Sequence, residues 1–146
     1  MWQCDTCGKK IKAVEDGWVE WITVVNQKKG TSTGRDLRLV HKGKCQFNER
    51  AENDKDGGIV GDLGLADFLG PDGLVALLEL LDRGEIPQVD VIAMIQRLHV
   101  PGYEQARPHF KRAISEGVIE PNMAPGFYVQ SDIEAVIAWE KGQRQR

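Results

Sequence analysis

The sequence predicts an α+β protein with a small β module at its N-terminus and a helical domain after it. Up to residue 50 the apolar residues have strand character, because many are β-branched or aromatic. After residue 62 they recur mostly at helical spacing. A segment rich in charges and glycine separates the two patterns, as a linker or a frayed helix end would. We therefore expect a β module over 1–50, a polar linker over 51–62 and a helical domain over 63–146.

Two segments of the first region are predicted to be strands. Residues 17–25, Gly-Trp-Val-Glu-Trp-Ile-Thr-Val-Val, combine β-branched and aromatic side chains. Residues 36–41, Asp-Leu-Arg-Leu-Val-His, form the second strand. Residues 26–35 lie between them and contain two glycines and three Ser or Thr, so we expect a hairpin loop there.

The helical domain is predicted from start and stop signals. Pro71 can occupy the first turn of a helix, and Gly84 ends that helix. Ser131 and Glu134 have the spacing of a capping box, which indicates the start of the last helix. The elements between them are expected to be helices over 88–98 and about 103–116, then a short hairpin with strands 118–120 and 127–129.

Composition and charge restrict the function. The 146 residues carry a net charge of −3, and no apolar run is long enough to cross a membrane. The N-terminus lacks the basic and apolar pattern of a secretory signal, so we expect a cytoplasmic protein without a membrane partner. Residues 1–56 have a net charge of +2 and residues 57–146 a net charge of −5. Tight, nonspecific nucleic-acid binders are normally more basic.

The three cysteines suggest a metal site. Cys4-Asp-Thr-Cys7-Gly-Lys has the zinc-knuckle pattern, in which a small residue after the second cysteine lets backbone amides point at the sulfurs. His41 and Cys45 supply a second pair, spaced H-x3-C. Three sulfurs and one nitrogen complete a closed tetrahedral set with no open position. The sequence therefore predicts one structural Zn²⁺ and no catalysis at this site, and the segment resembles zinc-knuckle and zinc-ribbon modules.

An energetic consideration favours the metal. A domain of about 50 residues buries too little apolar surface to fold unaided. Zinc contributes on the order of 10 kcal/mol in comparable small modules. We therefore expect the β module to need its metal in order to fold.

Other interpretations of these side chains stay open. The two knuckle cysteines could be a redox pair, although that motif normally opens a helix in a βαβ unit, and no such context is present. Cys45 could be an ordinary buried thiol, with His41 a hydrogen-bonded residue at a strand end. His99 and His109 are alternative ligands from the helical region.

One pattern in the helical region is carried by Ile95-Gln-Arg-Leu98-His-Val100, then by Ala106, Phe110, Ile114, Gly117 and Ile119. It resembles the winged helix-turn-helix superfamily, in which a Leu-x-Val ends the second helix and a Gly-x-Ile enters the wing. The resemblance covers about residues 71–141. The sequence departs from it in a turn one residue longer than usual and in Pro108, which lies inside the expected third helix. The helix could instead begin at Pro108.

The resemblance implies a nucleic-acid surface. In it, Arg107, His109, Lys111 and Arg112 would face the DNA groove, and Arg97 would reach a phosphate. The same charges could form a solvated face, and winged helices also make protein–protein contacts. No nucleophile or cofactor loop is evident, so we expect no enzyme and no small-molecule substrate. The expected function is a regulator that binds DNA or the transcription apparatus; the alternative is a protein–protein adaptor with a structural zinc and no nucleic-acid binding.

Overall fold

The computed structural model describes residues 1–146 and divides into two compact units, Met1–His99 and Val100–Arg146. The linker expected over 51–62 lies inside the first unit instead of between two domains. The helices expected to form one domain over 63–146 are shared between the two units.

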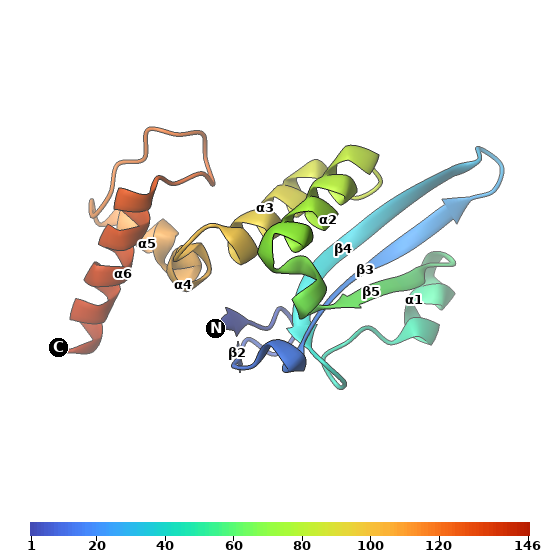
Figure 1. Ribbon diagram of the computed structural model, residues 1–146, viewed down its shortest axis with the longest axis horizontal. Helices are drawn as coiled ribbons and strands as arrows, with labels where there is room; N and C mark the ends of the chain where they lie inside the picture. Colours follow the sequence, from blue (N-terminus) through green and yellow to red (C-terminus); the bar gives the residue numbers. More distant parts are fainter. The chain divides into compact units, whose positions relative to one another are not determined.

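The first unit contains a three-stranded antiparallel sheet (Figure 1). Its strands are β3 (Gly17–Asn26), β4 (Thr31–His41) and β5 (Ile59–Gly64), in the order β4-β3-β5. The expected strands at 17–25 and 36–41 both form. β4 begins earlier than expected, because Thr31–Gly34 pair with β3 and shorten the hairpin loop.

The segment predicted as a linker is held in place by helix caps and by an ion pair to β4. It forms α1 (Glu49–Asp56) followed by β5. The Asn48 side chain caps α1 by accepting from the Ala51 amide, and Gly57, at φ 75°, ends it. Arg35 of β4 donates to Glu52 at 2.8 Å, which ties this polar helix to the sheet. The charged segment is therefore a capped, ion-paired helix followed by a strand, and neither a linker between domains nor a frayed helix end.

The rest of the first unit packs around one shared core. Figure 1 shows α2 (Gly70–Arg83) and α3 (Gln88–His99) side by side over the strands. Val19 of β3 lies in this core, whereas the next residue, Glu20, points to the opposite face of the sheet, where it meets Phe47. The N-terminal pair β1 (Trp2–Gln3) and β2 (Lys10–Ile11) and the short 3-10 helices η1 (Val14–Asp16) and η2 (Leu65–Phe68) complete the unit.

This core joins the N-terminal segment to the helices. Cys4 and Ile11 belong to the same buried cluster as Phe68, Leu77 and Met94. The first 50 residues are therefore part of a unit of 99 residues and do not depend on a small core of their own.

The second unit is helical. It contains α4 (Tyr103–Ala106), η3 (Arg107–His109), α5 (Phe110–Ser115) and α6 (Gln130–Arg144). Its core includes Phe110, whose ring stacks on that of Tyr128 with 3.7 Å between centroids. Pro108 lies in η3, so the expected helix over 103–116 is interrupted, as the missing N–H of proline requires.

These elements differ from a winged helix in two ways. Residues 118–129 form no strand, so the expected wing hairpin is missing. The helices before and after the expected turn belong to different units. The last helix begins at Gln130 with Val129 as its cap, so Ser131 caps nothing. The α+β class is confirmed; the winged helix is not.

No helix of the chain combines the length and apolar character that crossing a membrane requires.

Candidate metal centre

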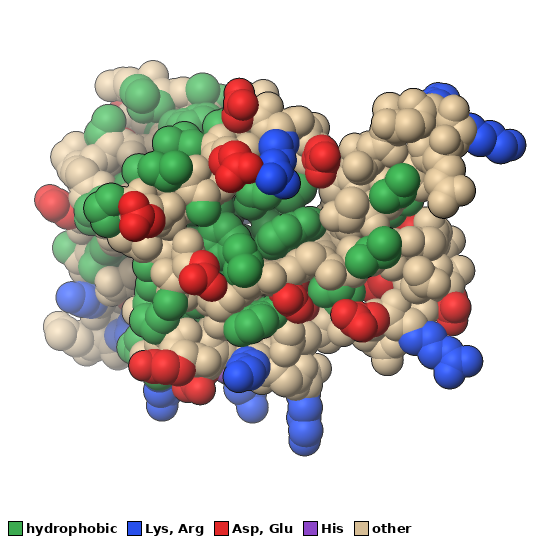
Figure 2. All heavy atoms as spheres, turned by 45° about the vertical axis from the view of Figure 1, so that its right-hand side comes forward, with side chains coloured by type: hydrophobic (Ala, Val, Ile, Leu, Met, Phe, Trp, Pro, Cys, Tyr) green, Lys and Arg blue, Asp and Glu red, His purple; other side chains and the backbone are tan.

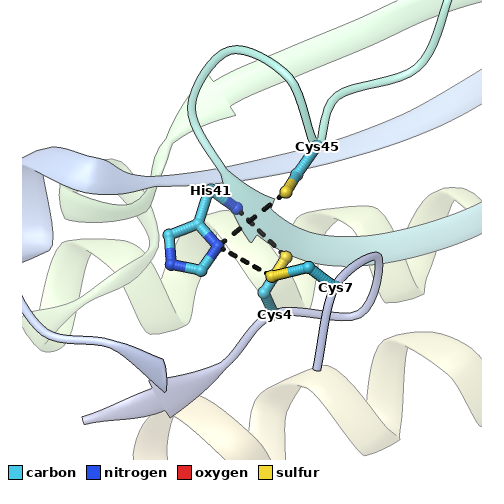
Figure 3. A group of neighbouring side chains, drawn as sticks. All are labelled: Cys4, Cys7, His41 and Cys45. Atoms are coloured by element: carbon cyan, nitrogen blue, oxygen red, sulfur yellow. Dashed lines mark hydrogen bonds between the residues drawn. The ribbon is translucent and has the colours of Figure 1, made fainter. Parts of the chain in front are cut away.

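The four predicted ligands meet at one end of the first unit (Figure 3). Cys4 and Cys7 lie in the turn between β1 and β2, His41 ends β4, and Cys45 lies in the loop that follows. Gly8, at φ 76°, closes the turn by donating its amide to the Cys4 carbonyl at 2.9 Å. A side chain at position 8 would strain this left-handed conformation, which explains the glycine after the second cysteine.

The ligand atoms are close enough to one another to surround a single ion. All four lie within 4.8 Å of one another. The His41 Nδ1 atom is 3.4 Å from the Cys7 sulfur and 3.9 Å from the Cys45 sulfur. Sulfur and nitrogen ligands about 2.3 and 2.0 Å from one tetrahedral ion would be about 3.6 Å apart. The four residues are therefore close enough to hold a metal ion, as the sequence predicted.

The orientation of His41 specifies which nitrogen faces the site. Its Nε2 atom is 3.1 Å from the Lys10 carbonyl oxygen, which can only accept a hydrogen bond. The proton therefore belongs on Nε2, and the lone pair of Nδ1 points toward the sulfurs. Metal-binding histidines use this arrangement, in which the second nitrogen donates to a carbonyl that holds the ring in place.

The thiols differ in acidity. Burial would raise the pKa of Cys4, but the backbone amides of Cys7, His41 and Thr6 outweigh it and lower the pKa to about 6. Burial, with the neighbouring Cys4 and Cys7 sulfurs, raises the pKa of Cys45 to about 11. Cys4 is therefore ready to bind as a thiolate, whereas Cys45 must lose its proton when a cation arrives.

The other interpretations of these residues gain less support. The Nε2 atom of His99 is 2.8 Å from the Phe68 carbonyl oxygen, and His109 belongs to the second unit. Neither histidine belongs to the cluster. All three cysteines are free thiols, and Cys45 lies with the knuckle rather than in a separate apolar pocket.

Arg97, expected to reach a phosphate, is instead buried beside the knuckle. Only 8% of it is exposed. Its guanidinium donates to the Asp5 carboxylate at 2.7 Å and to the Gln3 carbonyl at 2.9 Å. Asp5 also accepts from the Leu39 amide at 2.8 Å. Arg97 therefore links α3 to the turn that carries Cys4 and Cys7, and in the structure its partners are protein groups where a phosphate was expected.

The remaining residues of the expected DNA surface lie in the second unit, and most have acidic neighbours. Arg107 donates to Glu104 at 2.6 Å, and Arg112 donates to Glu116 at 3.4 Å. His109 lies 4.0 Å from Glu140, and the Arg112 guanidinium stands over the Trp139 ring. Lys111 is exposed.

Three residues that support the site were not predicted. Thr6, Glu20 and Arg38 contact the loop that carries Cys45. A signal existed for Glu20, because a carboxylate in the middle of an apolar strand must find a partner. Nothing in the sequence pointed to Thr6 or Arg38.

Comparison with family models, curated proteins and solved structures finds no match for this chain.

Proposed function

We propose that this is a non-enzymatic zinc protein, in which the ion fixes the shape of one end of the sheet. The observation that carries the proposal is the convergence of four ligand atoms from two distant segments. Three thiolates and one imidazole form the donor set that zinc prefers in structural sites. Since four protein ligands fill a tetrahedron, no position is left for a substrate or an activated water. The ion would supply a cross-link between the knuckle and β4.

We further propose that the partner is a protein rather than DNA, which makes the protein an adaptor. The charges support this choice, because residues 57–146 carry −5 and the arginines of the expected DNA surface are next to carboxylates. Figure 2 supports it for the side chains in view, among which Lys and Arg stand mostly singly between hydrophobic and acidic side chains. Such a surface gives a nucleic-acid backbone little to bind.

Two measurements test these proposals. Elemental analysis of protein purified without added metal should give one zinc per chain; a chain that neither carries nor takes up zinc would refute the zinc proposal. Fluorescence anisotropy with a random-sequence duplex should show no binding at 50 or 200 mM salt. Binding that weakens steeply between these concentrations would establish DNA as the partner in place of a protein.

A further inference from the structure

The loop that carries Cys45 is held by groups that are not metal ligands. The Cys45 carbonyl accepts from the Thr6 hydroxyl at 2.7 Å and from the Arg38 guanidinium at 3.2 Å. Thr6 lies between the two knuckle cysteines, so its hydroxyl joins the two halves of the metal site directly. Arg38 approaches the same carbonyl from β4.

A buried carboxylate anchors the arginine. Glu20 is fully buried, and its carboxylate accepts from Arg38 Nε at 2.8 Å and from the Phe47 amide at 3.0 Å. The Arg38 guanidinium also stands 3.5 Å over the centre of the Phe47 ring. Residues 45–47 are thus held through two backbone groups and one aromatic side chain.

Stability alone does not account for this arrangement. Removing a carboxylate from water is costly, and replacing a buried ion pair with apolar side chains is often neutral or stabilising. An apolar residue at position 20 could pack there, but it could not accept from the Phe47 amide or orient Arg38. The Glu20–Arg38 pair is therefore suited to orienting neighbouring groups. The groups that it orients are the Cys45 carbonyl and the Phe47 amide, both in the loop that carries Cys45.

We propose that Thr6, Arg38 and Glu20 are positioning residues, which hold Cys45 at its place in the tetrahedron before the ion binds. This inference rests on the proposed zinc site. It assigns a role to the threonine inside the knuckle, and it explains how a ligand in a loop can stay aligned with three ligands on other elements. Groups that orient metal ligands typically contribute 10- to 100-fold to metal affinity.

Thr6 gives the cleanest test, because it is exposed and its replacement should not disturb the core. Thr6→Val removes the hydroxyl at nearly constant shape, whereas Thr6→Ser keeps it. Thr33→Val makes the same change at an exposed position of β4 near the hairpin tip. Zinc Kd is measured by competition with a chromophoric chelator, and the free energy of unfolding of each metal-free protein by urea denaturation.

We expect Thr6→Val to raise the zinc Kd about 10-fold, with Thr6→Ser and Thr33→Val within about 2-fold of wild type. Arg38→Lys keeps a charge beside Glu20 but cannot also reach the Cys45 carbonyl, so it should raise Kd as well. With Co²⁺ in place of zinc, the visible ligand-field spectrum of Thr6→Val should change in shape, a signature that lower stability alone would not produce.

The zinc site and the positioning role of Thr6, Arg38 and Glu20 can be refuted separately. Wild-type protein that binds no zinc would overturn the proposed function and the positioning role with it. Wild-type protein that binds zinc, with a Thr6→Val variant of equal Kd and unchanged Co²⁺ spectrum, would overturn the positioning role alone. An equal rise in Kd for Thr6→Val and Thr6→Ser would also overturn it, since the serine retains the hydroxyl.

Discussion

Removal of the metal should loosen the first unit locally and leave its sheet folded. A self-standing module of 50 residues would collapse without zinc, but here Cys4 and Ile11 share a core with Phe68, Leu77 and Met94. The shared core keeps the first 50 residues attached to α2 and α3 whether or not an ion is bound.

The stability that remains without zinc comes from hydrogen bonds that need no metal. Hydrogen bonds of 2.7 to 2.8 Å join Asp5 to both backbone groups of Leu39, and Thr6 to the Cys45 carbonyl. Three such bonds contribute about 2–4 kcal/mol together, which is enough to keep the metal-free turn mostly closed. Zinc at about 1,000 times its Kd adds about 4 kcal/mol, because it binds only the folded form. For a unit of this size, that corresponds to a fall in Tm of about 16–32 °C when zinc is chelated.

Tryptophan fluorescence can follow the first unit alone. Trp2, Trp18 and Trp21 pack against its core, and Trp139 is the only tryptophan of the second unit. In a Trp139→Phe background, EDTA should lower the Tm of the fluorescence transition and leave the far-UV circular dichroism of the sheet in place at 25 °C. Hydrogen exchange should rise at residues 4–10 and 42–47 only. Loss of the sheet signal in EDTA would refute the reasoning from the shared core, and an unchanged Tm would show that folded protein does not bind the ion.

The remaining predictions concern charge and packing. Arg35 lowers the pKa of Glu52 and Asp56, so its stabilisation is present above their unfolded pKa values near 4 and is lost as pH falls through the folded values. Arg35→Met should therefore unfold at lower urea concentration than wild type at pH 7 and at a similar one at pH 3; an equal deficit at both would exclude the ion pairs as the cause. A Cβ at Gly73 would lie 2.1 Å from the Phe68 backbone, so Gly73→Ala should cost about 1–3 kcal/mol in urea denaturation. Gly142 in α6 has open space around it, so Gly142→Ala should stabilise its helix by about 0.5–1 kcal/mol; a loss of stability there would contradict the open environment.

The candidate metal cluster could be predicted because its chemistry is local. Cysteines two residues apart and an H-x3-C pair restrict the site whatever the rest of the fold does, and the structure brings Cys4, Cys7, His41 and Cys45 close enough together to hold an ion. β3 was predictable for a similar reason, since its β-branched and aromatic residues leave few alternatives.

Long-range pairing could not be predicted in the same way. Glu52 looks like a solvated charge in the sequence, and its role appears only when β4 brings Arg35 to it. Arg97 looked like a phosphate ligand because its partner Asp5 is 92 residues away. The winged helix is not confirmed, for another reason. A permissive pattern of small and apolar residues fits many packed helices, and Pro108 interrupts the helix that the pattern required.

Because the core is shared, the first 50 residues would need a metal ion for the rigidity of their loops and not for folding. In a module too small to fold unaided, zinc supplies the folding free energy of the whole structure. In a unit of 99 residues the same ion would act on two loops of a structure that already has its own core. Those loops already hold Thr6 and Cys45 in contact, so an ion would add rigidity to a conformation that the chain adopts without it. Rigid loops lose less entropy on binding a partner than mobile ones. The end of the sheet that carries the four ligands is therefore where partner affinity should fall when zinc is removed while the fold persists.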